Sequence, residues 1–403
     1  MTRLIEILIS FAIVAALMLI VGLVLPSSRH LSESVETNRK MTIVFDTINS
    51  LRRFQDWNPL ALRDPQAEFK LSGPTSGVGA KLSWNSDVDS VGDGSWEIIE
   101  SVPGRSVKYA IENERRGHNK ITEFTLTPTG RGAVKRNVEI TQTYDVDYGW
   151  NLLGRYAGLY VSRNVGDDMK YGLSRMSSML AAVPNVDYAV EGSKMRGMAD
   201  MQRPAEDLLV VKAGAIERNN EKIKGSMKSN MEWIKRVMDA NDLVAAGPMR
   251  IISTELGRET YTFDIAQPVR KAGSGNEEDG DDADEAGEET AATSDSDEEN
   301  AGEDGELTFT VDTMAPVTAA GEPLDITIPE GAPVEYMQTE PRHVAVAYYT
   351  GFMAELDNVR NALRAWALTQ GFEVAGRPFE VYKNGVDTAF TADGEYEVYW
   401  TLK

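Results

Sequence analysis

The chain contains no cysteine and only three histidines among its 403 residues. Without cysteine there is no disulfide framework, no cysteine-ligated zinc or iron–sulfur site and no thiol nucleophile. The sequence also lacks a Walker loop, a Gly-x-Ser-x-Gly elbow, a His-Glu-x-x-His pair and a dinucleotide fingerprint. We therefore predict no metal, no cofactor and no catalytic residue, and these absences lean against an enzyme. They do not fix the compartment, since cytosolic and exported proteins can both lack cysteine.

Positive charge is scarce: 41 Lys and Arg stand against 63 Asp and Glu, which makes the formal net charge −22. One segment, residues 272–306, holds 16 of the acidic residues and no base, aromatic or large aliphatic residue. The remainder carries −6 (−22 minus −16) and is only mildly acidic. The segment cannot bury enough apolar surface to offset the entropy of ordering, so we predict a disordered acidic insertion.

This insertion has two interpretations. It is either a solvated insertion or an acidic arm that binds a basic protein partner. Nucleic acid is not an expected partner, because the sequence shows no basic patch and no DNA-reading motif.

A long apolar run opens the chain. Residues 7–25 carry no charge, and Ser10 is their only strongly polar residue. About 20 such residues in a helix cross a bilayer, so we predict a transmembrane anchor over 1–26 that contacts lipid through residues 4–25. A cleaved signal peptide is the alternative, but its apolar region is shorter and ends in a small-x-small site, which is missing here. The expected location is the plasma (inner) membrane, as a single-pass protein, and the short N-terminal tail favours soluble domains on the non-cytoplasmic side.

Residues 28–183 are predicted to form one domain. A strand and two short helices, the second ending at Asn58-Pro59, precede several segments in which apolar residues recur with period two. Such segments, separated by turns with Gly and Pro, indicate an antiparallel sheet with one buried face. A stripe with helical spacing from Val165 to Leu180 predicts a long closing helix.

This order resembles the SRPBCC superfamily of helix-grip proteins, which includes polyketide cyclase/dehydrase-like, START-like and lipid-transfer proteins. The motifs that carry the resemblance are Val44–Asn49 followed by Trp57-Asn58-Pro59, Gly77–Ala80 with Trp84, Gly92–Ile98, Ser101–Arg105 and Asp168–Leu173. The resemblance implies a cavity between sheet and closing helix that holds a small ligand, but it does not imply one activity. The candidate ligand-binding aromatics are Trp84, Trp96 and Tyr109, for which core packing is the alternative.

A polar linker over 184–205 is expected to lead into a second domain over 206–403. This region contains a weak internal repeat. Each copy is a strand, a helix and two further strands, with a Gly/Pro turn after the helix, and the acidic insertion falls between the copies. The predicted fold class is therefore α+β. It comprises an N-terminal transmembrane helix, a helix-grip antiparallel sheet with a long C-terminal helix, and a duplicated β-α-β-β domain.

The repeat resembles the gyrase-inhibitor-like small-molecule-binding domain, which also forms the effector-binding half of AraC-type regulators. The stretches that carry this resemblance are Val344–Gly351, Pro378–Tyr382 and Tyr396–Tyr399. No helix-turn-helix precedes them, which argues against a transcription factor. The resemblance implies a cleft lined by aromatics, often with a buried acid that selects cationic or amphipathic ligands. The candidates for such a cleft are Tyr348, Tyr349, Trp366, Glu380, Tyr382 and Trp400.

Two pocket-forming folds without a catalytic signature favour a membrane-anchored protein that binds small molecules in two cavities. The expected ligands are hydrophobic, amphipathic, lipid-like or cationic. Two alternatives stay open. One is a cyclase- or hydrolase-type enzyme that uses a pocket carboxylate such as Glu380, and the other is an interaction protein that acts through its acidic arm. For the aromatic candidates of the second domain core packing is the alternative, and for Glu380 it is a solvated position on a strand.

Overall fold

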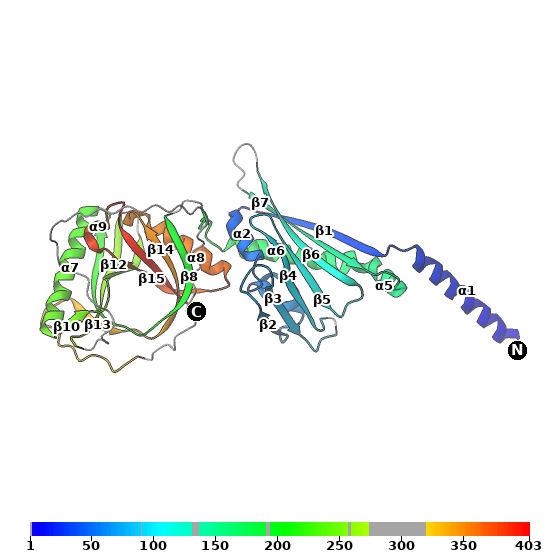
Figure 1. Cartoon of the computed structure of the whole chain (residues 1–403), viewed down its shortest axis with the longest axis horizontal. Helices are drawn as coiled ribbons and strands as arrows, with labels where there is room; N and C mark the ends of the chain where they lie inside the picture. The colour runs from blue at the N-terminus through cyan, green and yellow to red at the C-terminus, as the bar shows by residue number, and fades with distance from the viewer. Residues whose placement is uncertain (1, 90, 131–136, 191–193, 257–258, 274–319) are drawn as a thin grey trace, which may run out of the picture. The chain divides into compact units, whose positions relative to one another are not determined.

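The computed structural model describes residues 2–89, 91–130, 137–190, 194–256, 259–273 and 320–403 (Figure 1). The predicted acidic insertion lies outside the described residues, except for residues 272 and 273. The chain divides into two compact units. Unit 1 comprises Met1–Asp200, Ala345–Pro378 and Thr388–Lys403, and unit 2 comprises Met201–Val344 and Phe379–Asp387.

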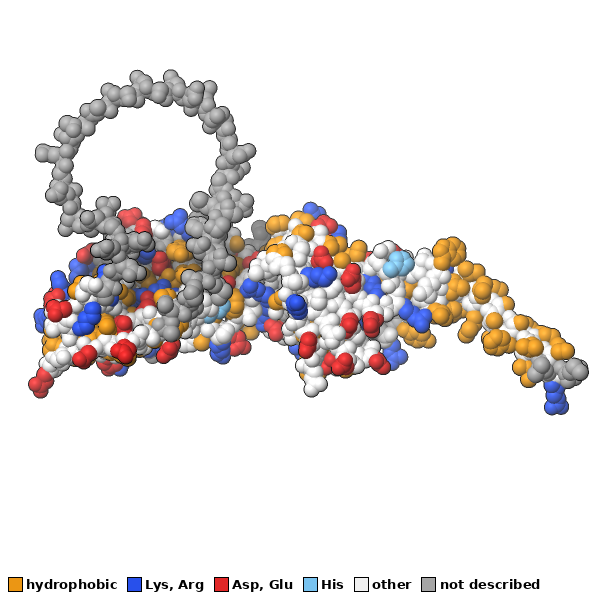
Figure 2. Space-filling model, turned by 60° about the horizontal axis from the view of Figure 1, so that its bottom comes forward, with side chains coloured by type: hydrophobic (Ala, Val, Ile, Leu, Met, Phe, Trp, Pro, Cys, Tyr) orange, Lys and Arg blue, Asp and Glu red, His pale blue; other side chains and the backbone are white. Residues whose placement is uncertain are grey.

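The N-terminal helix α1 (Thr2–Val24) is long and apolar enough over Ile7–Val24 to cross a membrane. Its large apolar side chains are exposed to solvent, and hydrophobic side chains cover it in Figure 2. A membrane span and a signal sequence near the N-terminus both have these properties.

Unit 1 contains a seven-stranded antiparallel sheet with the strand order β1-β7-β6-β5-β4-β3-β2. The strands are β1 (Ser28–Thr37), β2 (Glu68–Ser72), β3 (Lys81–Asn85), β4 (Gly94–Val102), β5 (Ser106–Asn113), β6 (His118–Thr129) and β7 (Asn137–Asp147). Burial alternates along β6 and β7, where Phe124 and Ile140 are fully buried. The period-two pattern of the sequence therefore does mark the face of the sheet that carries the core.

Short helices and one long helix lie between and after these strands in the sequence. They are α2 (Met41–Ile48), α3 (Phe54–Trp57), α4 (Leu60–Arg63), α5 (Leu152–Ala157), η1 (Gly158–Tyr160), the π-helical turn η2 (Ser162–Gly166) and α6 (Asp167–Ala181). The closing helix α6 buries Met169, Leu173 and Met176 and packs on β1 and α3. The prediction of a mixed α+β fold with antiparallel sheets and one apolar N-terminal helix is confirmed.

The core of unit 1 also includes a helix from late in the chain. Helix α8 (Leu356–Thr369) packs on α2, and its Ala362 and Ala365 are fully buried in the same core as the sheet. The Tyr188 hydroxyl donates to Oδ2 of Asp46 at 2.8 Å and lies 3.2 Å from the Thr369 hydroxyl. These hydrogen bonds tie α8 to α2.

The remaining strands of unit 1 have the order β15-β16-β14-β8. Their bounds are β8 (Met195–Arg203), β14 (Arg342–Thr350), β15 (Val374–Tyr382) and β16 (Glu395–Leu402), and the turn η3 (Met353–Glu355) follows β14. The end of β8, the start of β14, the end of β15 and most of the short helix α9 (Gly385–Thr388) belong to unit 2. Residues 184–205, expected as a linker, therefore include the strand β8.

In unit 2 the strands have the order β13-β9-β12-β11, followed by residues 379–382 of β15. The elements are β9 (Asp207–Glu217), α7 (Asn220–Ala240), β10 (Leu243–Ala245), β11 (Arg250–Leu256), β12 (Thr260–Lys271) and β13 (Val334–Gln338). Helix α7 begins after Asn219, whose side chain accepts from the backbone of Glu221 and Lys222. Apart from the three-residue strand β10, the order β9-α7-β11-β12 and the order β14-α8-β15-β16 are both strand–helix–strand–strand. The duplicated effector-binding domain itself stays a prediction.

Candidate functional site

A cavity of about 100 Å³ lies in unit 1 between the curved sheet and the segments that cover it. Its walls come from α3, α4, the strands β3 to β7 and the start of α6. The side chains that line it fall into two groups. One is an apolar wall dominated by tryptophans, and the other is a polar group that includes three charged residues.

Three tryptophans form the apolar wall: Trp57 at the end of α3, Trp84 on β3 and Trp96 on β4. They surround Phe54, whose ring centroid lies 6.3 Å from that of Trp84 and 5.1 Å from that of Trp96. Trp57 and Trp96 meet edge to face at 6.0 Å. Because these ring contacts fix the side chains against one another, the wall is shaped before any ligand arrives.

Two buried polar atoms in the walls have no hydrogen-bond partner in the described part of the chain: Nε1 of Trp84 and Oε1 of Gln142. The orientation of the Gln142 amide follows from its neighbour Thr122. The Thr122 hydroxyl donates to the Thr143 carbonyl at 2.6 Å, so it accepts from Nε2 of Gln142 at 3.2 Å. The amide oxygen is thereby left without a donor. A buried polar group left unpaired costs about 1–3 kcal/mol, which a suitable ligand would recover.

Charged residues form an edge of the cavity. Arg63 of α4 makes a hydrogen-bonded ion pair with Asp168 in the first turn of α6, and Nη1 of Arg115 lies 4.0 Å from the other carboxylate oxygen. The side chains of Arg63 and Asp168 are 38% and 25% exposed, so this pair lies where the cavity meets solvent. Tyr144 of β7 also lines the cavity. Burial raises its pKa to about 12, so its phenol is protonated at neutral pH and can donate a hydrogen bond.

Lys120 supports the charged edge. Its Nζ donates to the backbone carbonyl of Asn113 at 3.0 Å and to the Asn113 side chain at 2.7 Å, and it also donates to the Arg115 carbonyl. Burial lowers the pKa of Lys120, and the charge of Arg115 lowers it further. These bonds hold the end of β5 and the turn to β6, which carry the cavity-lining residues Asn113 and Arg115.

The structure separates the three aromatic candidates of this domain. Trp84 and Trp96 lie in the cavity wall. Tyr109 lies elsewhere: it is 1% exposed, its hydroxyl donates to the Ile48 carbonyl, and its ring packs against Trp96 and Phe124. Tyr109 is therefore a core residue and not part of the cavity wall, because its one polar atom is already used by the backbone of α2.

The six candidates of the second region do not line this cavity. Tyr348 is 41% exposed on β14, whereas its neighbour Tyr349 is buried, stacks on Tyr396 and donates from its hydroxyl to Glu355 at 2.5 Å. Trp366 of α8 is partly buried against the core of unit 1. Trp400 lies on β16, and its indole Nε1 is buried without a partner among the residues described.

Glu380 and Tyr382, the other two candidates, belong to the part of β15 that lies in unit 2. Glu380 is fully buried, and its Oε2 accepts from the Ser253 hydroxyl at 3.3 Å, which itself lies 2.8 Å from the Tyr261 hydroxyl. Glu380 is thus not the solvated strand residue that was its alternative interpretation. A ligand-binding role for these six residues stays a prediction.

A comparison with known protein families gives a match for the first domain. Residues 28–180 match the model of a family described as polyketide cyclase / dehydrase and lipid transport. No curated protein sequence gives a significant match.

Several solved structures are similar over part of the chain. A norcoclaurine synthase point mutant from Thalictrum flavum, in complex with a transition state analogue, is 12% identical with a TM-score of 0.30, over 38% of this chain and 97% of that one. A protein from Chromobacterium violaceum is 16% identical with a TM-score of 0.27, over 38% and 96%. The C-terminal domain of EcmrR is 11% identical with a TM-score of 0.32, over 51% and 97%. The gyrase-inhibitor-like resemblance of the second region stays a prediction, whereas the family match confirms the polyketide cyclase/dehydrase-like character of residues 28–180.

Proposed function

We propose that the domain over residues 28–180 binds a small, largely apolar molecule that carries a hydroxyl or a similar polar group. The observation that carries this proposal is the apolar tryptophan wall, together with one unpaired donor, Nε1 of Trp84, and one unpaired acceptor, Oε1 of Gln142, on side chains that line the same cavity. A hydroxyl can accept from the first and donate to the second. The family match, whose description includes lipid transport, supports a small-molecule ligand.

The size of the cavity limits the ligand. An apolar cavity of about 150 Å³ holds benzene, whereas this cavity measures about 100 Å³. A ligand with one ring therefore fits after a small displacement of side chains. A lipid with two acyl chains would need a much larger displacement. The partly exposed Arg63–Asp168 pair can separate to admit a ligand at small cost, because such ion pairs contribute at most about 1 kcal/mol to stability.

These side chains support binding, and those that line the cavity offer no activated nucleophile. Nucleophilic catalysis needs a hydroxyl or thiol next to a base. Among the residues that line the cavity, the Thr122 hydroxyl already donates to a backbone carbonyl, and Asp168 is already paired with Arg63. Neither group is available as an activated nucleophile or as an unpaired base.

We also propose that α1 anchors this domain to a membrane. The support is the way in which the domain holds the end of the helix. Arg155 of α5 donates to the carbonyl oxygens of Leu23 at 3.0 Å and Leu25 at 3.2 Å, and to that of Gly149 at 2.7 Å. A cation at the C-terminal end of a helix satisfies its free carbonyls and opposes its dipole. The helix is therefore fixed to the domain at the point where it would leave the bilayer.

An exposed apolar patch lies in the same region. This interfacial patch consists of Trp150, Leu153, Leu159 and Tyr160, which are 83%, 66%, 51% and 63% exposed. Its helix α5 contacts α1, and the Tyr156 hydroxyl donates to the Met18 carbonyl at 2.6 Å. Trp and Tyr are enriched where membranes meet water. The interfacial patch is thus placed to enter the membrane surface beside α1.

Binding of p-cresol and of toluene to the full chain in nanodiscs tests the cavity proposal, with empty nanodiscs as the blank. The two compounds differ only in the hydroxyl. We expect p-cresol to bind at least about tenfold more tightly, since one good hydrogen bond in a buried site contributes about 1.4 kcal/mol. The Gln142→Leu variant should lose most of this preference. The matched control is Gln66→Leu, at an exposed position of the same domain. Equal binding of both compounds, or an unchanged preference in Gln142→Leu, would contradict the proposal.

A further inference from the structure

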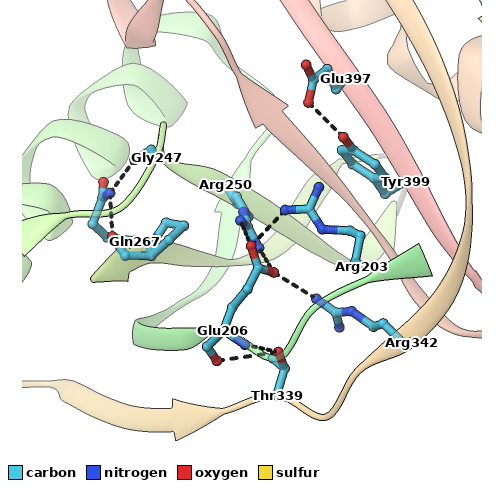
Figure 3. A network of polar contacts seen from close by, with 10 residues as sticks. Arg203, Glu206, Gly247, Arg250, Gln267, Thr339, Arg342, Glu397 and Tyr399 are labelled. Atoms are coloured by element: carbon cyan, nitrogen blue, oxygen red, sulfur yellow. Dashed lines mark hydrogen bonds and ion pairs between the residues drawn. The ribbon is translucent and has the colours of Figure 1, made fainter. Parts of the chain in front are cut away.

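A second cluster of charged residues lies in unit 2. Arg203, Arg250 and Arg342 converge on the carboxylate of Glu206 (Figure 3). The same three guanidinium groups also lie against the ring of Phe379. We call these five residues the arginine cluster. Arg203 ends β8, Arg250 begins β11, Arg342 begins β14, and Glu206 immediately precedes β9. The four charged residues therefore come from the ends of four strands, in three segments that are distant in sequence, and Phe379 comes from β15.

Two of the arginines donate hydrogen bonds to the Glu206 carboxylate. Arg250 binds it with both Nη atoms, and its Nη1 donates to Oε2 at 2.7 Å. Nη2 of Arg203 donates to Oε1 at 2.7 Å. Nη2 of Arg342 lies 3.7 Å from Oε2, which is an ion pair but too long for a hydrogen bond. Of these three arginines, Arg203 and Arg250 donate hydrogen bonds to the Glu206 carboxylate and Arg342 does not.

Of the three arginines in the arginine cluster, Arg342 makes the fewest hydrogen bonds to Glu206. Its Nη2 makes no hydrogen bond to Glu206, and its Nε, like that of Arg250, is buried and finds no hydrogen-bond acceptor in the described ranges of the chain. The centre of its guanidinium lies 4.9 Å from the centroid of the Phe379 ring. This contact attracts the cation but offers no acceptor for its N–H groups. The side chain is 24% exposed, so a solute can reach it.

The charges of the arginine cluster also leave Arg342 without a carboxylate of its own. Three cations share one carboxylate, and Arg203 has a further contact besides those already described. Burial lowers the pKa of Arg342, and the charges of Arg250 and Arg203 lower it further, against the opposing effect of Glu206. Since an arginine side chain stays protonated in proteins, the cation persists without its full set of partners.

We propose that the arginine cluster binds an oxyanion, the phosphate or carboxylate group of a small solute, with Arg342 as its main donor. A planar guanidinium presents two parallel N–H groups that match two oxygens of such a group. Arg250 already binds the carboxylate of Glu206 in this manner. The Phe379 ring lies against all three guanidinium groups and limits their movement. A cationic ligand, which the family resemblance of this region implies, is repelled by the same three charges.

Titration of three oxyanions into the full chain in nanodiscs tests this proposal. The probes are inorganic phosphate, phenyl phosphate and succinate, each at constant ionic strength with chloride as the balancing ion. They distinguish free phosphate, a phosphate ester and a carboxylate. We expect saturable binding of at least one probe, measured by calorimetry, and at least tenfold weaker binding in Arg342→Gln. Arg342→Lys keeps the charge but loses the planar fork, and it should bind with intermediate affinity.

The matched control is Arg236→Gln, which removes the same charge from an exposed position of α7. It should bind the probe as the unmodified chain does. If Arg342→Gln does not fold, the comparison of Arg342→Lys with the control decides the question. The proposal is overturned if none of the three probes binds saturably, or if the Arg342 variants bind as tightly as the control. Neither result bears on the cavity in unit 1, which contains none of these residues.

Discussion

Gly94 pairs with Trp84 across β3 and β4, and a Cβ atom on Gly94 would lie 2.3 Å from Cζ2 of the indole ring. The same Cβ would lie 2.5 Å from the backbone carbonyl oxygen of Glu112, which cannot move without disturbing β5. A glycine at this position therefore lets the Trp84 ring lie close against the backbone of β4. One wall of the cavity depends on the absence of a single side chain.

The Gly94→Ala substitution is expected to displace the Trp84 ring and to lower the free energy of unfolding by about 1–3 kcal/mol. Urea unfolding of the full chain, followed by tryptophan fluorescence, measures both effects. The control is Gly225→Ala within α7, where a Cβ meets no atom within 4 Å. That variant should gain up to about 1 kcal/mol, since alanine favours a helix over glycine. A Gly94→Ala protein with unchanged stability would show that the wall tolerates the extra atom.

The ion pair between Arg63 and Asp168 is expected to control the escape of a bound ligand. Asp168→Asn removes the pair at little cost to stability, because both side chains are partly exposed. A loss of up to about 1 kcal/mol corresponds to dissociation of p-cresol up to about fivefold faster, which NMR exchange measurements detect. Asp56→Asn breaks the comparable pair with Arg53 outside the cavity and serves as control. Equal rates in the two variants would place the entrance elsewhere.

The sequence predicted those parts of the fold that follow from local periodicity. Alternation over the strands β3 to β7 and the apolar stripe of α6 set which face of each element is buried, and the structure has both. The same alternation buries Trp84, Trp96 and Tyr109 alike. It cannot separate a cavity wall from a packed core, because side chains in both are shielded from water. The Tyr109 hydroxyl bond to Ile48 makes the distinction, and it depends on where α2 packs.

The polar residues of the cavity do leave a signal in the sequence. Gln142 shares the buried parity of Ile140 and Tyr144 on β7, and Thr122 shares that of Phe124 on β6. Polar residues on the core side of a strand are uncommon unless they have a task or a partner. The charged edge gave no comparable signal, since its members come from three distant segments. They meet only when α4, α6 and the turn between β5 and β6 pack together.

Insertion of the interfacial patch predicts quenching of Trp150 by lipid. With the full chain in vesicles of brominated phosphatidylcholine, the tryptophan fluorescence should fall, and most of this fall should be absent in Trp150→Phe. Trp150 is 83% exposed beside the end of α1. Trp233→Phe on α7 in unit 2 is the control and should be quenched like the unmodified chain.

Two results would count against membrane insertion. One is equal quenching in the Trp150→Phe and Trp233→Phe variants. The other is an intact mass that lacks the first residues after expression in a native membrane. The second result would identify the apolar run as a cleaved signal sequence instead of an anchor.

We expect Glu206 to make the unfolding free energy of unit 2 depend on pH. Burial raises the pKa of Glu206, but the hydrogen bonds and charges of Arg250 and Arg203 outweigh it and lower the value from 4.5 to about 2. A carboxyl group with a lowered pKa in the folded state stabilises that state above its unfolded pKa, and this contribution is lost as pH falls through the folded pKa. The shift corresponds to about 3 kcal/mol.

The unmodified chain should therefore exceed Glu206→Gln by about 3 kcal/mol in unfolding free energy at pH 6, and this difference should shrink as pH falls from about 4.5 to about 2. Urea unfolding in phosphate-free buffer measures it, since an added oxyanion would partly replace the missing carboxylate. Glu335→Gln removes an exposed ion pair with Lys212 and should cost less than about 1 kcal/mol at any pH. If the difference for Glu206→Gln does not change with pH, it arises from lost packing and not from the charge that holds the arginines together.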